Sequence, residues 1–174
     1  MKKESLTYFL LKVSIYISSI GLIFAGPFPL SAQGKERVFS HISIDEGLSA
    51  NHVKAVMRDR NGFLWIGTTN GLNRYDGSLV KRYSCHDSER NKGNNNIGYL
   101  YEDSKGTIWI GTDRGVYYYT PETEIISYAD YWDDLAGGAL NWVQDIEGDD
   151  KGNIWVLIPD QGIFRTSANG VNLY

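Results

Sequence analysis

One ten-residue phrase occurs three times in the chain and constrains its fold more than any other feature. The copies are Asp59–Thr68, Asp103–Thr112 and Asp149–Ile158. In each copy a glycine lies three residues after the aspartate and a tryptophan six residues after it, and successive tryptophans are 44 and 46 residues apart. Repeats of this length indicate a propeller, a solenoid or another array of similar units.

Each copy has the pattern of a turn followed by a short strand. Asp-x-x-Gly is typical of a turn, because the carboxylate binds amides further along and glycine accepts a positive φ. The apolar run after it is β-branched and aromatic, which favours a strand over a helix. We expect further strands at residues 53–58, 72–75 and 79–83, at 97–102, 116–119 and 124–128, and at 143–147 and 163–165.

Four short antiparallel strands in about 40–50 residues make a propeller blade. The sequence therefore predicts an all-β chain, a partial β-propeller of three four-stranded antiparallel blades whose ring is not closed, after an N-terminal signal-peptide helix. The predicted blades are 47–85, 86–130 and 131–174, with 34–46 as a candidate closing strand of a missing last blade. Open edges and bare apolar faces predict pairing with the remaining propeller blades or self-association.

Residues 1–33 have the parts of a secretory signal peptide. Lys2 and Lys3 give a positive start, and the uncharged stretch 13–26 is followed by prolines and small residues. That stretch is shorter than the ~20 residues of a membrane-spanning helix, which favours cleavage over an uncleaved anchor. Both alternatives predict a periplasmic or otherwise extracytoplasmic location, with membrane contact only through 1–33 if it is retained.

The charges and the rarer side chains narrow the classes of function. Asp and Glu number 21 against 17 Lys and Arg, and the net charge of −4 argues against nucleic acid as a partner. The single cysteine, Cys85, forms no disulfide within the chain and has no partnered histidine. The acidic run 145–150 lacks the ligand spacing of a calcium loop. We therefore expect no cofactor, no metal and no catalytic residue in this chain.

The repeated motifs resemble the two-component regulator propeller repeat. The residues that match this family's pattern are Gly47-Leu48-Ser49, Asn51, Val53, Asp59–Thr68, Gly71–Asp76, Asp103–Thr112 and Gly115–Tyr119. The third repeat departs from the pattern, because Leu157 and Ile158 replace Gly-Thr and Gly162 comes one residue late. The matches extend over nearly all of the chain after the signal segment.

The resemblance implies the N-terminal periplasmic sensor region of a Bacteroidetes-type hybrid two-component histidine kinase. It further implies two propellers, an Ig-like domain, a membrane helix, a kinase domain and glycan fragments as signals. The chain looks like the front of such a sensor, truncated or in a separated reading frame, non-catalytic in itself and responsive to carbohydrate. One alternative is a periplasmic propeller lyase or glycosidase, whose carboxylate pair a sequence does not reveal. The other is a propeller scaffold that binds protein.

Candidate ligand-binding residues lie outside the repeated phrase. Tyr131, Trp132 and Trp142 place aromatic rings near the carboxylates of Asp133 and Asp134, a combination suited to an oligosaccharide or a partner protein. The alternative is that these residues pack against the irregular third blade. Structural roles are predicted for Asp59, Gly62, Trp65, Gly67, Gly71, Asp103, Gly106, Trp109, Gly111, Gly115, Asp149, Gly152, Trp155 and Gly162.

Overall fold

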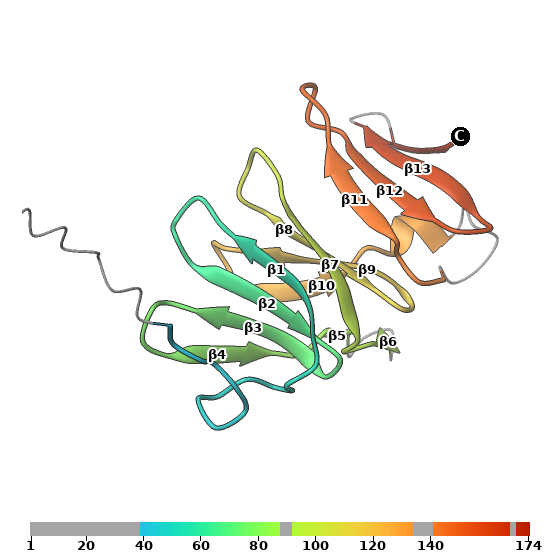
Figure 1. Cartoon of the computed structure of the whole chain (residues 1–174). Coiled ribbons are helices and arrows are strands. Elements are labelled where there is room, and N and C mark those ends of the chain that lie inside the picture. The colour runs from blue at the N-terminus through green and yellow to red at the C-terminus, as the bar shows by residue number, and fades with distance from the viewer. Residues whose placement is uncertain (1–38, 88–91, 134–140, 168–169) are drawn as a thin grey trace, which may run out of the picture. The chain divides into compact units, whose positions relative to one another are not determined.

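The computed structural model describes residues 39–87, 92–133, 141–167 and 170–174 (Figure 1). The chain divides into two units, Met1–Phe39 and Ser40–Tyr174. The predicted signal segment 1–33 lies outside the described residues. Among the residues that are described, no helix has the length and apolar character needed to cross a membrane.

Three four-stranded antiparallel sheets form the second unit, and we number them blades 1 to 3 in chain order (Figure 1). Blade 1 contains β1 (Val53–Arg58), β2 (Leu64–Thr68), β3 (Gly71–Tyr75) and β4 (Val80–Tyr83). Blade 2 contains β7 (Ile97–Glu102), β8 (Ile108–Thr112), β9 (Gly115–Thr120) and β10 (Ile125–Tyr128). Blade 3 contains β11 (Asp145–Gly148), β12 (Ile154–Ile158), β13 (Gly162–Ser167) and β14 (Gly170–Leu173). The predicted all-β fold of three open four-stranded blades is confirmed.

Two short elements lie outside the blades. β5 (His86–Asp87) pairs with β6 (Lys92–Gly93), and a 3-10 helix, η1 (Asp130–Trp132), follows blade 2. The sequence gives no apolar alternation at these places, so neither element was predicted. Residues 39–43 form no strand. The pairing of 34–46 with a last blade, and the blade boundaries at 47, 86 and 131, stay predictions.

Two apolar clusters hold neighbouring blades together. The first joins blades 1 and 2 and consists of Trp65, Leu72, Cys85, Ile97, Leu100, Ile108, Ile110, Tyr117, Tyr119 and Tyr128. The second joins blades 2 and 3 and consists of Trp109, Val116, Ala129, Trp132, Val143, Ile146, Ile154, Val156, Ile158 and Phe164. Alternation along each strand supplies one face to each cluster, since successive side chains point to opposite sides of a sheet.

The glycine of the Trp-Ile-Gly-Thr sequence lies in close contact with the next blade. A Cβ added at Gly67 would lie 2.7 Å from Cγ2 of Ile97, and one added at Gly111 would lie 2.8 Å from Cγ1 of Val143. Both distances are shorter than any ordinary van der Waals contact. These two glycines are therefore required by packing between blades. In blade 3 the same register position is Leu157, which is half-buried.

The β2–β3 turn is closed by its threonine, and the corresponding turn of blade 3 is built differently. Thr68 Oγ1 donates to the Gly71 carbonyl at 3.0 Å and accepts from the Asn70 amide at 3.0 Å. Blade 3 has Ile158 in place of the threonine and one more residue in the turn. The hairpin still forms, because Asp160 adopts a positive φ of 64° and the Gln161 amide donates to the Ile158 carbonyl at 3.1 Å.

Candidate functional site at the second blade boundary

The aspartate of each repeat fixes both a turn and a tryptophan. In blade 1, Asp59 Oδ1 accepts from the amides of Asn61 and Phe63, each at 2.9 Å. Its other oxygen, Oδ2, accepts from Trp65 Nε1 at 2.8 Å. One carboxylate thus binds the start of the turn, the start of the strand and the indole, so the orientation of the ring is set by the residue six positions before it.

Blades 2 and 3 repeat this arrangement. Trp109 Nε1 donates to Asp103 Oδ2 at 3.1 Å, and Trp155 Nε1 donates to Asp149 Oδ2 at 3.0 Å. Asp149 also accepts from Asn153 Nδ2 at 2.7 Å. The hydrogen bond from Asn153, followed by that from Trp155, holds the pKa of Asp149 far below its ordinary value. Sequence reasoning anticipated the turn but not the indole bond, although the constant six-residue separation was a signal for it.

An arginine bridges blade 1 to blade 2 beside this turn. Arg60 donates from its backbone amide to Glu102 Oε2 at 2.9 Å and from Nε to Glu102 Oε1 at 2.6 Å. Its Nη1 donates to the Ser104 carbonyl at 3.0 Å, and its Nη2 donates to the Asp103 carbonyl. Several bonds from one guanidinium set the spacing of the two turns more firmly than a single surface ion pair does.

The boundary between blades 2 and 3 has no equivalent bridge. Ser104 occupies the repeat position of Arg60, and Gly148 occupies that of Glu102. The Tyr101 side chain lies over Gly148, where an added Cβ would come within 2.1 Å of the Tyr101 hydroxyl. A glutamate at position 148 would have to displace the Tyr101 side chain, and the residues that form the Arg60 bridge at the first boundary are absent here.

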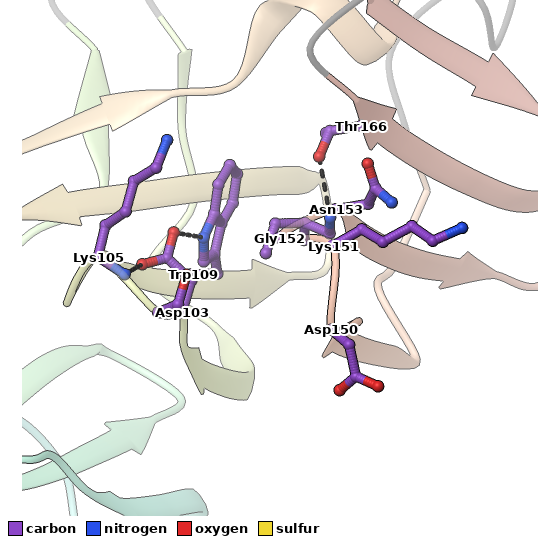
Figure 2. Close-up of a pocket in the computed structure, with 10 residues that line it drawn as sticks. Asp103, Lys105, Trp109, Asp150, Lys151, Gly152, Asn153 and Thr166 are labelled. Atoms are coloured by element: carbon purple, nitrogen blue, oxygen red, sulfur yellow. Dashed lines mark hydrogen bonds between the residues drawn. The ribbon is translucent and has the colours of Figure 1, made fainter.

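A cavity of about 490 Å³ lies at this second boundary (Figure 2). Its lining residues are Asp103, Ser104, Lys105, Trp109, Asp150, Lys151, Gly152, Asn153, Ile154 and Thr166. Figure 2 shows Trp109 and Asp103 on one side of the cavity and Asn153 and Thr166 on the other. The side chains of Lys105 and Lys151 extend in different directions, so their charges do not converge on one point.

This cavity has the size and the lining of a small-molecule site. Ligand pockets commonly measure about 300–1,000 Å³ and combine an aromatic surface with a few polar groups. Here the aromatic residue is Trp109, which is only 9% exposed because it stacks on Trp132, and most of the lining is polar or charged. The corresponding space at the first boundary, beside Trp65 and Arg74, measures about 210 Å³. The smaller size is consistent with the Arg60 bridge beside it.

Two of the predicted ligand residues, Tyr131 and Trp132, lie beside this boundary. Trp132 is fully buried and stacks on Trp109, with ring centroids 6.1 Å apart and planes inclined by 5°. A fully buried indole offers no face to a sugar, so a direct contact between Trp132 and a ligand is not supported. Tyr131 packs edge-on against Trp132 at 5.6 Å and remains 39% exposed.

The other predicted ligand residues are not gathered into one site. Asp133 Oδ1 accepts from the Tyr128 hydroxyl at 2.6 Å, and burial, together with this bond, raises the pKa of Tyr128. Trp142 is 49% exposed and belongs to none of the ring contacts found among the described residues. Asp134 lies outside the described residues. The cavity residues Ser104, Asn153 and Thr166 were missed, because no sequence pattern brings turns of two repeats together.

Cys85 and the acidic residues show no sign of a reactive or metal centre. Burial raises the pKa of the Cys85 thiol to about 12, so the thiol stays protonated and unreactive near neutral pH. Within the part of the chain that the structure describes, no group of three or more His, Cys, Asp or Glu side chains is arranged to hold a metal ion.

The family model for the two component regulator propeller matches residues 47–70 and 91–114, which contain the turn, the Trp strand and the Gly-Thr turn of blades 1 and 2. Over these residues, blades 1 and 2 are similar to two component regulator propeller repeats. "Histidine kinase P4" of Formosa agariphila is 41% identical over 54 residues, which cover 31% of this chain and 4% of that protein.

Solved structures with the same fold come from B. thetaiotaomicron. The extracellular domain of a hybrid two-component system is 28% identical with a TM-score of 0.65, over 78% of this chain and 20% of that chain. A second such extracellular domain is 26% identical with a TM-score of 0.62, over 72% of this chain and 19% of that chain. The propeller repeats described here thus span about a fifth of these relatives.

Proposed function

We propose that this chain is a piece of the extracytoplasmic sensory propeller of a hybrid two-component system. The observation that carries the proposal is the match to an extracellular domain of such a system, at 28% identity over 78% of this chain. In this role the chain is exported, acts in the periplasm and does no chemistry. It binds a signal molecule, and the displacement of blades relative to one another is passed on by further parts of the sensor.

The contacts of the acidic side chains support a non-catalytic role. Glycoside hydrolysis needs two carboxyl groups that face one scissile bond. In the structure, the repeat aspartates are bonded to their indoles and turns, and Glu102 is bonded to Arg60. Glu124 is paired with both Lys81 and Arg74, which hold its pKa below its ordinary value and so disfavour a role as a general acid.

A carbohydrate is the signal that the second-boundary cavity suits best. Sugars present apolar C–H faces and many hydroxyl groups, and the cavity opposes an indole to short polar side chains. Ser104 and Asn153 supply a hydroxyl and an amide, and Trp109, which is 9% exposed, supplies a small apolar surface. The exposed rings of Tyr131 and Trp142 are two separate further candidates for contact with the same class of ligand.

Binding of purified oligosaccharides to the complete exported chain, measured by calorimetry, tests the ligand proposal. Ser104→Arg places at the second boundary the residue that occupies the first one, and it fills the cavity. We expect an affinity loss of at least about tenfold, as for any ligand that loses the space it occupies. Ser78→Arg, at an exposed turn of blade 1, is the matched control and should bind normally.

Two further measurements separate the alternatives. If Ser104→Arg binds as the unaltered chain does while Trp142→Ala does not, the ligand lies on the exposed aromatics and not in the cavity. Shortening of the oligosaccharide during incubation would favour the enzyme over the sensor. Deletion of the gene from the source bacterium should abolish a transcriptional response to the bound glycan, and an unaltered response would refute the sensory role.

A further inference from the structure

Blade 1 carries an arginine surrounded by aromatic rings on the face that meets blade 2. The Arg74 guanidinium lies 4.8 Å from the centre of the Phe63 ring and 5.8 Å from each of the Trp65 and Tyr83 rings. The Trp65 and Tyr83 rings are themselves in contact, with centroids 5.7 Å apart. Such cation–π contacts stabilise an arginine that has lost part of its water.

Blade 2 completes this site with one hydroxyl and one carboxylate. Arg74 Nη1 donates to the Tyr119 hydroxyl at 3.0 Å, and Nη2 pairs with Glu124 Oε1 at 3.2 Å. The Tyr119 ring also contacts Trp65 at 4.8 Å. With this cover in place Trp65 is only 1% exposed.

Blade 3 presents the same three side chains on its corresponding face. Trp155 pairs with Arg165 in the sheet register, as Trp65 pairs with Arg74 in blade 1. The Arg165 guanidinium lies 5.3 Å from the Trp155 ring and 5.0 Å from the Tyr174 ring, and the two rings are 5.5 Å apart. Blade 3 thus reproduces the first half of the blade 1 site.

The second half of the site is missing in blade 3. Tyr174 is 62% exposed and Ile163 is 42% exposed. Arg165 Nε is buried and has no hydrogen-bond partner among the described residues. A buried donor without a partner is unfavourable, and a charged donor more so.

We propose that this face of blade 3 is a docking surface for a further four-stranded propeller blade, which directs a tyrosine hydroxyl and a carboxylate at Arg165. The occupant is inferred from continuity with the interface between blades 1 and 2, where the same Arg and Trp receive those two groups. Charge complementarity supports it, since Arg165 brings a positive charge that no described carboxylate pairs with in a salt bridge.

Three differences between the faces of blades 1 and 3 specify the occupant further. Leu157 stands where blade 1 has Gly67, so the incoming blade needs a small residue at the position of Ile97. Asp145 and Glu147 stand in the register positions of Ala55 and Met57. Asp145 is hydrogen-bonded to Tyr99 of blade 2, so Glu147, which is exposed, is the residue that favours a basic or polar side chain on the first strand of the occupant. This inference follows from blade packing and does not depend on the proposed sensory function.

The proposal can be tested with a longer chain that carries an added blade of known sequence. A copy of residues 84–133, with Ile97→Ala in the copy, is joined after Tyr174, so that the copy offers its own Tyr119 and Glu124 to Arg165. Hydrogen exchange of the amides in β12 and β13 is compared in the original and extended chains. Docking should raise their protection by at least about tenfold, as expected when charged hydrogen bonds form in a covered interface.

Two variants show whether the predicted groups are responsible. Tyr119→Phe with Glu124→Gln, made only in the copy, leaves the host chain unaltered and should remove most of the added protection. Arg165→Met in the extended chain should do the same. Protection that does not change on extension, or that survives both variants, would overturn the proposal. A dimer of the original chain that Arg165→Glu dissociates, with no added protection in the extended chain, would show a second copy on this face and equally overturn it.

Discussion

The two blade boundaries share one repeated motif and yet differ in what lies between the blades. At the first boundary Arg60 and Glu102 join the turns, and the remaining space measures about 210 Å³. At the second boundary Ser104 and Gly148 stand in the same repeat positions, and the cavity measures about 490 Å³. The aspartate–indole bond is present on both sides of both boundaries.

The difference shows that the residues that form each blade are not the residues that determine the contacts between blades. The aspartate, the glycine and the tryptophan fix each turn and each ring, and they recur because every blade needs them. The residues directly before and after the aspartate differ between repeats. They lie toward the neighbouring blade, so the turn and the strand of their own blade do not fix their identity. The bridged boundary and the boundary with the larger cavity differ at these two positions, whereas the aspartate, the glycine and the tryptophan are the same on both sides.

The largest effect is expected from Trp65→Ala, compared with Trp155→Ala. Trp65 is 1% exposed and lies in the first cluster, so its loss should lower the free energy of unfolding by about 3–5 kcal/mol. Trp155 is half-buried on the open face of blade 3, and we expect a cost of about 1–2 kcal/mol there. Urea unfolding of the exported chain measures both. Equal losses would mean that blade 3 is covered as fully as blade 1.

A smaller effect is expected where one methyl group is added between blades. Gly67→Ala and Gly111→Ala should each cost about 1–3 kcal/mol, because the new Cβ would overlap Ile97 or Val143. Gly98→Ala is the matched control, since its Cβ would meet no atom closer than 4.0 Å. The same denaturant titration compares the three variants, and a harmless Gly111→Ala would show that blade 3 moves away easily.

The bonds between Arg60 and blade 2 should contribute less to the free energy of unfolding than the packing at Gly67 and Gly111 does. Arg60→Ala removes the bonds to Glu102 and to two carbonyls, but the Arg60 side chain is 48% exposed, so we expect a loss of about 0.5–1.5 kcal/mol. The loss should shrink in 0.5 M salt, because exposed ion pairs are screened. Ser104→Ala, at the equivalent position of the second boundary, should leave stability unchanged. A comparable loss from Ser104→Ala would erase the distinction between the boundaries.

The smallest effect should be a pH dependence of stability that comes from the hydrogen bonds to Asp149. Hydrogen bonds from Asn153 and Trp155 lower the pKa of Asp149 below its ordinary 3.8. A carboxyl group whose pKa is lowered by folding stabilises the fold above its unfolded pKa, and this contribution is lost as the pH falls through the folded value. The melting temperature of the unaltered chain should therefore fall below about pH 4 more steeply than that of Asp149→Asn. Parallel curves for the two proteins would contradict this.

Much of each blade was predictable because its strands alternate and its turns are marked by glycine. β1 and β7 begin and end at the predicted residues, Val53–Arg58 and Ile97–Glu102. β11 begins at Asp145 and not at the predicted 143, because Val143 lies in the second cluster and its amide donates to the Thr112 carbonyl of blade 2. That bond belongs to the contact between blades, which a strand pattern does not report.

The candidate site was much less predictable. Arg60 and Glu102 are 42 residues apart, and nothing in either repeat marks them as partners. Trp132 was predicted as a ligand contact, because an aromatic in a segment without periodicity reads equally well as core or as surface. The stacking on Trp109 favours the core position, and it depends on the path of the chain after β10.

The sequence by itself determined the blade: the spacing of aspartate, glycine and tryptophan defines a turn, a strand and a fixed indole, all by contacts within six residues. Tertiary structure alone decided which boundary is bridged, which holds a cavity, and on which face of blade 3 Arg165 Nε lies buried without a hydrogen-bond partner among the described residues. The physical reason is distance along the chain, because contacts within a repeat recur with its pattern, whereas contacts between repeats join positions that the pattern leaves free.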